Sequence, residues 1–374
     1  MTTKNSKKVL IFGSFDLLHP GHISLLRFAK QHGDVTAIIA RDKTIQKHKH
    51  QSPFYDEQTR VKNIENLKLA TPVLGDTKDH YAVLDTYTPD IIILGYDQKL
   101  FTDKLEAALQ EKNIQSEIIR APEFHPEHFK SSRLRRALSD PEAGFVYINK
   151  PKGITSHDVI YKLRKKLDTK KIGHAGTLDP LATGVLICGV NKATTLLDWW
   201  HTFPKTYKAE LEFGKVSDTY DSDGIVQEST NKTKPTIDEI QKKLHEMTGN
   251  IEQTPPAHSA KKVKGKKAYE LARKGKDFEL KSQTVTIHKI SLTLYEYPKA
   301  TITVTCSTGT YIRSLIHDLG QSLGCGAIMT GLTRSVIGPV TIDMCQSLDA
   351  TLHKTDVHSF QNIINQHFSK KELL

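Results

Sequence analysis

Short apolar runs alternate with helix-like segments over the first third of the chain. The apolar runs lie at residues 9–12, 35–40, 91–94 and 116–119. Runs of this length are typical of strands that are buried on both faces of a parallel sheet. Between them, residues 23–29 and 59–69 have the spacing of helices. The alternation predicts an α/β domain built on a doubly wound parallel sheet.

Polar and glycine residues follow the predicted strands. They are Gly13, Phe15 and Asp16 after the first run, Lys47 after the second, and Gly95, Asp97 and Gln98 after the run at 91–94. Ser131 and Ser132 open a further predicted helix. The carboxyl ends of parallel strands and the N-termini of helices form the ligand crevice of such a sheet. These positions therefore predict a phosphate or nucleotide site.

The turn after the first apolar run carries His19, Gly21 and His22 at the start of a helix. Two histidines three positions apart on a first helical turn can both face a phosphate, and a glycine between them allows close approach of the ligand. The string resembles the His-x-Gly-His signature of the cytidylyltransferase-like nucleotidyltransferases, whose fold is Rossmann-like. The surrounding strings are most similar to FAD synthetase of the archaeal type.

That resemblance implies transfer of a nucleotidyl group from ATP or CTP to a small phosphorylated acceptor, FMN among the candidates, with Mg²⁺ as the expected ion. By the same resemblance, His19 and His22 stabilise the transition state, Lys47 binds phosphate, and Asp97 and Gln98 lie by the base. The remaining expected nucleotide-binding residues are Gly13, Phe15, Asp16, Gly21, Gly95, Ser131 and Ser132. His50 and Gln51 stand where the pattern has a glycine and a basic residue. An alternative therefore stays open, in which this domain is inactive and serves as a binding or assembly module.

A different pattern begins near residue 145. Residues 174–183 contain one carboxylate, Asp179, which lies between Gly176 and Pro180 among uncharged neighbours. Turn-forming residues that fix the backbone around an isolated carboxylate can present it as a nucleophile or a base. An Asp-Pro pair is also an ordinary turn signal, and that reading stays open on these residues alone.

Further strings follow Asp179 in a fixed order, at residues 205–208, 217–224 and 309–315. Together they resemble the TruB family of tRNA pseudouridine synthases, over about Phe145 to about Val340. The resemblance implies an α+β domain with a mixed, largely antiparallel sheet. It also implies isomerisation of uridine 55 in the T stem-loop of tRNA, without any cofactor.

The same resemblance supplies site residues. Asp179 is the expected catalytic carboxylate and Arg313 its cationic partner, while Tyr207 stacks on the flipped base and Tyr311 lies beneath it. The sequence does not choose between attack at the sugar, attack at the base and removal of a ribose proton. The expected substrate-binding residues are Lys150, His174, Asp221 and Leu332, with a basic segment of Lys261, Lys262, Lys264, Lys266 and Lys267.

Composition agrees with two enzyme domains. The expected division is 1–140, a linker at 141–144, a synthase domain at 145–340, and a tail at 341–374 too short for a complete extra RNA-binding domain. Lys and Arg outnumber Asp and Glu by 21 to 18 in residues 1–140 and by 32 to 24 in the remainder, so the RNA-type part is the more basic. The four cysteines have no metal-ligand spacing, and there is no signal peptide or apolar membrane span. We expect a cytoplasmic protein without a membrane partner. Its oligomeric state is not specified by the sequence.

Overall fold

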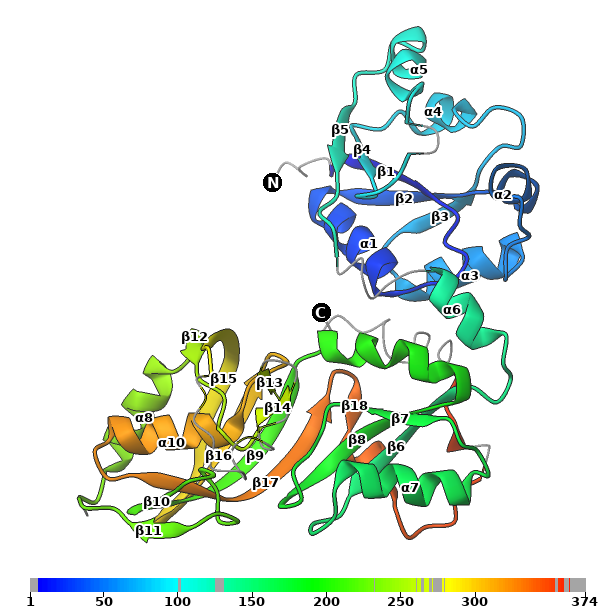
Figure 1. The fold of residues 1–374 in the computed structure, drawn as a ribbon. Coiled ribbons are helices and arrows are strands. Elements are labelled where there is room, and N and C mark those ends of the chain that lie inside the picture. The colour runs from blue at the N-terminus through cyan, green and yellow to red at the C-terminus, as the bar shows by residue number, and fades with distance from the viewer. Residues whose placement is uncertain are drawn as a thin grey trace. The chain divides into compact units, whose positions relative to one another are not determined.

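The computed structural model contains two compact units, which are described separately. The first comprises Met1–Gly144 with His358–Leu374, and the second comprises Phe145–Val357 (Figure 1). The structure describes residues 6–99, 102–124, 131–231, 233–259, 261–263, 266–268, 271, 278, 280–353, 356–359 and 363. No helix in this described part is long and apolar enough to cross a membrane.

The first unit is built on a five-stranded sheet. Its strands are β1 (Lys8–Gly13), β2 (Asp34–Ile39), β3 (Thr71–Leu74), β4 (Ile91–Leu94) and β5 (Glu117–Arg120). They lie in the order β3-β2-β1-β4-β5, and every neighbouring pair is parallel. The predicted doubly wound parallel sheet is confirmed. Because the chain passes from β3 to the other side of β1 at β4, the switch point of the sheet lies at the ends of β1 and β4.

Helices connect these strands. They are α1 (Pro20–His32), α2 (Asp42–Lys49), α3 (Glu57–Leu67), α4 (Ala82–Tyr87), α5 (Leu105–Glu111) and α6 (Ser131–Leu138). The helix predicted at 59–69 begins two residues earlier, because Asp56 caps it by accepting a hydrogen bond from the Thr59 amide at 2.8 Å. It ends at Lys68, which adopts a left-handed conformation.

The second unit contains a ten-stranded mixed sheet. Its main path is β12 (Gly249–Gln253), β15 (Gln283–Glu296), β16 (Lys299–Cys306), β9 (Lys205–Phe213), β17 (Ala327–Ile337), β8 (Ala182–Val190), β6 (Gly144–Lys150) and β19 (Gln346–Ser347). β7 (Ile172–Ala175) pairs with β8, and β18 (Val340–Thr341) pairs with β17. Most of the pairs are antiparallel, whereas β17 with β8 and β19 with β6 are parallel. The expected mixed, largely antiparallel sheet is confirmed.

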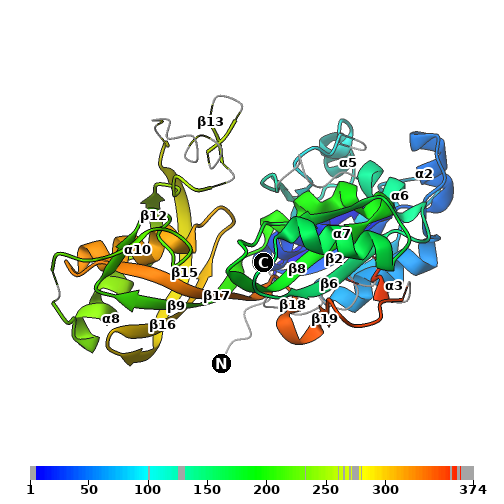
Figure 2. The same cartoon turned by 60° about the horizontal axis from the view of Figure 1, so that its bottom comes forward.

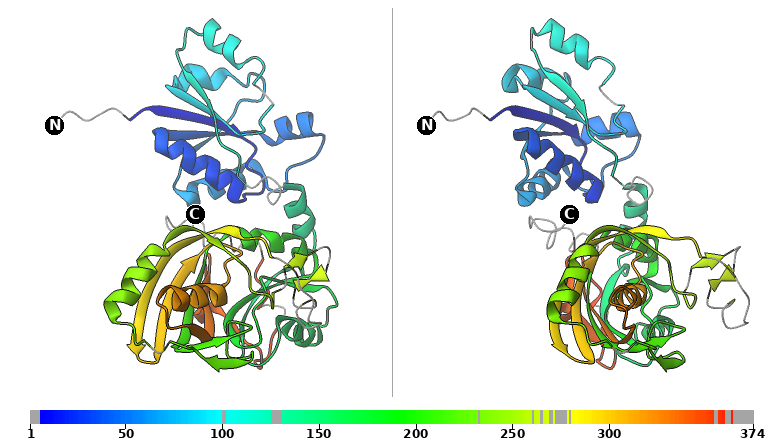
Figure 3. Two further views of the ribbon diagram at one scale, coloured as in Figure 1. Left: turned by 60° about the vertical axis from the view of Figure 1, so that its left-hand side comes forward. Right: turned by 90° about the vertical axis from the view of Figure 1, so that its left-hand side faces the viewer.

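Helices cover this sheet. α8 (Ile237–Glu246) and α10 (Ile312–Ser322) contribute apolar residues to one core cluster with β9, β16 and β17, and they lie beside one another (Figure 3). α7 (Ser156–Lys166) packs with β6, β7 and β8 in a second cluster. A 3-10 segment, η1 (Asn191–Thr202), follows β8, and η2 (Ile342–Met344) precedes β19.

Short strands complete the unit. β10 (Lys215–Ser217) and β11 (Val226–Glu228) form one hairpin, and β13 (Lys262–Val263) and β14 (Lys266–Lys267) form another that stands apart from the main sheet (Figure 2). β19 falls in the expected tail, yet it belongs to the main sheet. A two-residue strand carries no hydrophobic periodicity, so the sequence pattern could not indicate it.

Candidate functional site

The loop that joins β7 to β8 in the second unit carries Asp179. Ser156, the first residue of α7, accepts a hydrogen bond from the Leu178 amide at 2.9 Å, and its hydroxyl lies 3.1 Å from the Leu178 carbonyl. The amide of Gly153 donates to the carbonyl of Pro180 at 2.8 Å. The backbone is therefore held on both sides of Asp179 by one short segment, residues 153–156.

Arg313, the second residue of α10, lies beneath this carboxylate. Its Nε is 3.1 Å from Oδ2 of Asp179, and the two side chains are 8% and 42% exposed. Nη1 donates to the Thr219 carbonyl at 3.0 Å, and Nη2 donates to the His258 carbonyl at 2.9 Å. The guanidinium is fixed by two backbone carbonyls and leaves Asp179 accessible.

The two predicted tyrosines lie on separate elements. Tyr207 is a buried residue of β9, and burial raises its pKa. Tyr311 is the N-cap residue of α10, and its backbone is bracketed by Gln253, which accepts from the Tyr311 amide at 2.7 Å and donates to its carbonyl at 3.0 Å. Leu332 packs on the cluster that contains Tyr207 and Leu181. Tyr207 and Leu332 thus share a core cluster with Leu181 of the Asp179 loop, and Tyr311 immediately precedes the helix of Arg313.

Two expected substrate-binding residues have supporting positions instead. Lys150 is completely buried, and its ammonium donates to the carbonyls of Pro151 at 2.9 Å and Ile154 at 2.6 Å. Burial lowers its pKa to about 8. Asp221 is 4% exposed, with Oδ2 3.5 Å from Nη1 of Arg313. Substrate contact by these two residues stays a prediction, because a short motif indicates which residues gather at a site but not which way their side chains point.

The structure places His174 on β7 and describes part of the basic segment. His174 is partly buried on β7, its Nδ1 has no hydrogen-bond partner among the described residues, and burial lowers its pKa. Lys261 donates to Oε1 of Gln283 at 2.5 Å. The backbone of the β13–β14 hairpin includes Lys262, Lys266 and Lys267. The side chains of these three lysines, and the whole of Lys264, lie outside the described residues.

Arg334 was not indicated by the sequence reasoning. This residue of β17 is 1% exposed; its Nε donates to the Val185 carbonyl at 2.8 Å and its Nη2 to the Gly176 carbonyl at 3.0 Å. It also lies close enough to the Tyr207 side chain to act on the pKa of that tyrosine. One buried guanidinium thus lies between the Asp179 loop and Tyr207. An arginine inside the otherwise apolar and neutral run 327–337 was the available signal.

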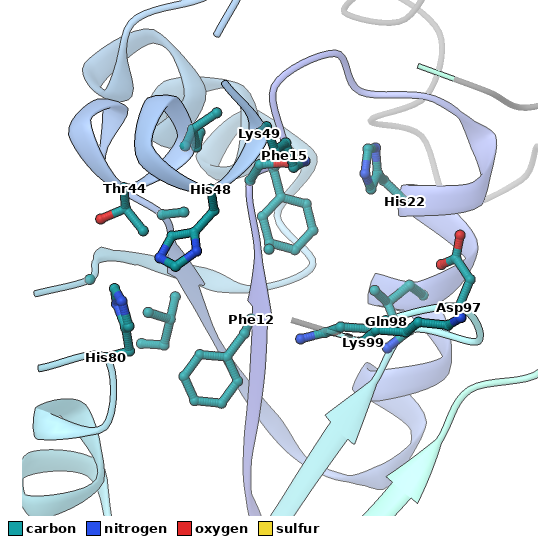
Figure 4. Close-up of a pocket in the computed structure, with 18 of the residues that line it drawn as sticks. Phe12, Phe15, His22, Thr44, His48, Lys49, His80, Asp97, Gln98 and Lys99 are labelled. Carbon is teal, nitrogen blue, oxygen red and sulfur yellow. Dashed lines mark hydrogen bonds between the residues drawn. The ribbon is translucent and has the colours of Figure 1, made fainter. Parts of the chain in front are cut away.

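In the first unit, a cavity of about 410 Å³ lies at the ends of β1 and β4. Figure 4 shows His22 and Asp97 at one end and His48 and His80 at the other, with Phe12 between them. Gly13, Phe15, Lys49, Gly95 and Gln98 also line it. The expected ligand crevice of the parallel sheet is therefore a real cavity.

The two histidines of the signature are stacked. The rings of His19 and His22 have centroids 3.8 Å apart and an interplanar angle of 25°. Burial lowers the pKa of both, and for His22 the pKa falls to about 4, with the nearby charge of Lys49 as the second cause. Both imidazoles are neutral at physiological pH. A neutral imidazole can still donate a hydrogen bond to a phosphate oxygen.

The structure also shows how the rim of this cavity is held. A side chain at Gly13 would meet the Phe15 ring at 2.5 Å, and Phe15 itself has φ +45°. Oε1 of Gln98 accepts from the Gly95 amide at 3.2 Å. Arg60, which is completely buried, donates to the Ser14 carbonyl at 2.6 Å and was not indicated by the sequence reasoning. Gly21 lies in the first turn of α1.

The structure places Lys47 away from the cavity and Asp16 in an ion pair, and it does not describe the side chains of two expected serines. Lys47 is exposed and does not line the cavity, whereas Lys49 does and donates to the Ser14 hydroxyl at 3.1 Å. The carboxylate of Asp16 accepts from the Phe54 amide and pairs with Arg135 at 2.8 Å, so it joins the β1 loop to α6. The side chains of Ser131 and Ser132 lie outside the described residues.

Comparisons with known proteins separate the same two parts. Residues 164–312 match the TruB family pseudouridylate synthase (N terminal domain), and residues 10–137 match the cytidylyltransferase-like family. A crystal structure of the lipopolysaccharide core biosynthesis protein from Thermoplasma volcanium GSS1 is 33% identical, and the match covers 32% of this chain and 98% of that one with a TM-score of 0.30.

The matches with two curated relatives cover most of the length of each relative. The chain is 44% identical over 234 residues to the tRNA pseudouridine synthase B of Protochlamydia amoebophila, covering 62% of this chain and 86% of that protein. It is 46% identical over 211 residues to the tRNA pseudouridine synthase B of Parabacteroides distasonis, covering 54% of this chain and 88% of that protein. Together with the buttressed Asp179 and its contact with Arg313, these matches establish that the chain belongs to the tRNA pseudouridine synthase B family and carries a cytidylyltransferase-like domain in its first part.

Proposed function

We propose that the second unit isomerises uridine 55 in the T-loop of tRNA. The observation that carries this proposal is the pair of Asp179 and Arg313, in which a buried guanidinium contacts an accessible carboxylate. Isomerisation breaks the bond from the base nitrogen to the ribose and rejoins the turned base through carbon. Because the reaction has no net redox change, no cofactor enters the proposal.

The surrounding residues have separate tasks. Asp179 reacts with the extruded nucleotide, while Tyr207 and Tyr311 contact the base, since aromatic side chains stack on extruded bases. The basic segment at 261–267 binds the phosphates of the T stem-loop, because lysines contribute most of the sequence-independent affinity for nucleic acid. Arg334 keeps the loop and Tyr207 in register.

Replacement of Asp179 by Asn tests this assignment. The amide keeps the shape of the side chain but loses its charge and nucleophilicity, so tritium release from uracil-C5-labelled tRNA should stop while tRNA affinity stays close to that of the wild type. Asp223→Asn, which changes an exposed carboxylate of the neighbouring turn, is the matched control. A rate above roughly a hundredth of the wild-type rate in Asp179→Asn would contradict a catalytic carboxylate.

We further propose that the first unit transfers a nucleotidyl group from ATP or CTP to a phosphorylated acceptor such as FMN. A phosphate oxygen of the acceptor attacks the α-phosphorus, and the bond to pyrophosphate breaks. The cavity supports this reaction because His22 and Lys49 lie along its wall and can stabilise charge that develops on the phosphates. Asp97 and Gln98 approach it from the end of β4 and are placed to contact the base.

Mg²⁺ belongs to this proposal as the companion of the triphosphate. Among the described residues no group of three or more His, Cys, Asp or Glu could hold a metal ion. Mg²⁺ commonly uses one or two carboxylates together with substrate phosphates, and Asp76 and Asp97 line the cavity. When bound, it would neutralise charge on the phosphates and orient them.

A pyrophosphate-release assay on the whole chain tests the second activity. The protein is incubated with ATP or CTP and with FMN, glycerol 3-phosphate or phosphoethanolamine, and pyrophosphate is measured. His22→Ala should lower the rate about a hundredfold while weakening nucleotide binding much less, because its contacts strengthen in the transition state. Asp179→Asn is the control and should transfer normally. Nucleotide binding without pyrophosphate release in the wild type would favour an inactive binding module.

A further inference from the structure

The turn at residues 219–221 contacts the catalytic arginine from both of its ends. The Thr219 carbonyl accepts from Nη1 of Arg313 at 3.0 Å, and Oδ2 of Asp221 lies 3.5 Å from the same nitrogen. The Thr219 hydroxyl also donates to Oδ1 of Asp221 at 2.6 Å, which ties the two ends together. Displacement of this turn would therefore rotate the guanidinium, whose Nε contacts Asp179.

Tyr220, between those two residues, has a left-handed backbone. Its φ is +64°, a conformation that is unfavourable for a large side chain and is adopted far more readily by glycine or asparagine. Such backbone strain persists only where surrounding contacts fix it, and it is concentrated at functional sites. A contact of the Tyr220 side chain must therefore offset the cost of this conformation.

That contact is a ring stack with His317. The centroids of the two rings are 3.9 Å apart with an interplanar angle of 15°. His317 lies on α10, four positions after Arg313, so it is on the same helix face one turn later. The tyrosine ring therefore lies against the face of the imidazole, and within the described part of the chain Nδ1 of His317 has no hydrogen-bond partner.

The other side of the turn is bound to β17. The Met329 amide donates to the Tyr220 carbonyl at 3.0 Å, and the Ser222 amide donates to the Met329 carbonyl at 2.9 Å. These bonds fix the turn along the strand. On the side of α10 the turn is held by its contacts with Arg313 and by the Tyr220 ring, which stacks on His317 one helical turn beyond Arg313.

We propose that Tyr220 and His317 are positioning residues for the isomerisation, because their stacked rings hold the turn that orients Arg313 toward Asp179. The proposal rests on the catalytic role given above to Asp179 and Arg313. It differs from a merely structural role, in which the tyrosine would only close a tight turn and any residue that accepts the left-handed conformation would serve equally well.

Tyr220→Gly separates the two roles. Glycine accepts the φ of +64° without strain, so the turn can form, but the ring is lost. The single-turnover rate on C5-labelled tRNA should fall about tenfold with little change in KM for tRNA, since small displacements of a catalytic group are costly in rate. Tyr220→Phe keeps the ring and should stay within about twofold of the wild-type rate.

Double variants show whether the residues act as a unit. Tyr220→Gly with His317→Leu should be no slower than the slower single variant, because both remove one stack. In an Arg313→Lys background, Tyr220→Gly should add little further loss, because the group it positions is already altered. A crystal structure of Tyr220→Gly should also show Nε of Arg313 displaced from Oδ2 of Asp179, a readout that does not depend on activity.

Folding is checked in the same experiment. Both tryptophans of the chain, Trp199 and Trp200, are buried in this unit, so their fluorescence follows its unfolding. Asp168→Gly, at another non-glycine residue with positive φ (+47°), is the matched control and should leave the rate unchanged. If Tyr220→Gly lowers the unfolding temperature, Tyr220→Asn, which also tolerates this conformation, replaces it. Wild-type rates in the ringless variants, or an undisplaced Arg313, would overturn the proposal.

Discussion

Asp221 and Arg313 form a buried ion pair beneath Asp179. Oδ2 of Asp221 lies 3.5 Å from Nη1 of Arg313, and the two side chains are 6% and 8% exposed. Arg313 thus lies between one buried and one exposed carboxylate. The buried carboxylate holds the guanidinium in place, and the exposed one faces solvent. In the proposed isomerisation this arginine therefore serves both the stability of the unit and the reaction.

Removal of Arg313 should therefore affect both the stability of the second unit and its activity. Arg313→Met should abolish isomerisation and destabilise the second unit by about 3–5 kcal/mol, because it leaves the Asp221 carboxylate buried without its partner. Urea unfolding followed by tryptophan fluorescence measures the loss. Adding Asp221→Asn should recover much of the stability but none of the activity. A double variant as unstable as Arg313→Met would show that Asp221 does not depend on this pair.

Four of the five strands of the first unit were predictable from their composition, whereas β3 was not predicted. β4 coincides with the apolar run at 91–94, and β2 and β5 are shifted by one residue from the predicted runs. β3 lies at the edge of the sheet and has no fully buried residue, so it carries no apolar run of the kind that predicts a buried strand. β18 and β19 could not be predicted, since two residues of a strand are stabilised by pairing and not by a local pattern.

Site residues were predictable as a group but not in orientation. The order of the strings brought Asp179 and Arg313 together, and the structure places them in contact. Lys47 and Lys49 show that the sequence does not tell which of two nearby side chains faces the cavity. Both lie on α2, and two positions along a helix correspond to about 200° of rotation, so only one can face the cavity. Arg334 was missed because the interior position of a charged residue is decided by tertiary hydrogen bonds.

The lysine pair gives a test of the nucleotide site. Lys49→Ala should lower nucleotidyl transfer by about tenfold to a hundredfold, because Lys49 lines the cavity beside Ser14 and can reach the phosphates. Lys47→Ala, two positions away on the exposed face, is the matched control and should change the rate by less than about twofold. Pyrophosphate release is the measurement. The reverse ranking of the two variants would return the phosphate-binding role to Lys47.

The basic segment of the second unit predicts a salt-dependent effect. Replacement of Lys261, Lys262, Lys264, Lys266 and Lys267 by Ala should weaken tRNA binding and flatten the plot of log affinity against log salt, because each lost phosphate contact removes roughly one released counterion. Filter binding at several salt concentrations measures the slope. Lys242→Ala, on the exposed face of α8, controls for loss of surface charge. A slope equal to that of the wild type would mean that these lysines face solvent.

The lowered pKa of His22 predicts how the stability of the first unit depends on pH. The folded pKa is about 4, against an ordinary value of 6.5, and burial is the main cause. Between these values the unfolded chain binds a proton that the folded unit does not. Stability is therefore complete above about pH 6.5 and falls as the pH is lowered toward 4. Because His22 keeps partial exposure, we expect its share of the loss to be at most about 3 kcal/mol.

His22→Gln isolates this contribution, because glutamine does not titrate. The variant should lose less stability than the wild type between pH 6.5 and 4, although His19, whose pKa is also lowered by burial, keeps some dependence. Hydrogen exchange of the β1 amides, corrected for the intrinsic effect of pH, reports on this unit. Tryptophan fluorescence reports on the other unit, where Trp199 and Trp200 lie, and should show no difference between the two proteins. Parallel stability curves for wild type and variant would place the acid sensitivity of the first unit elsewhere than in the imidazole of His22.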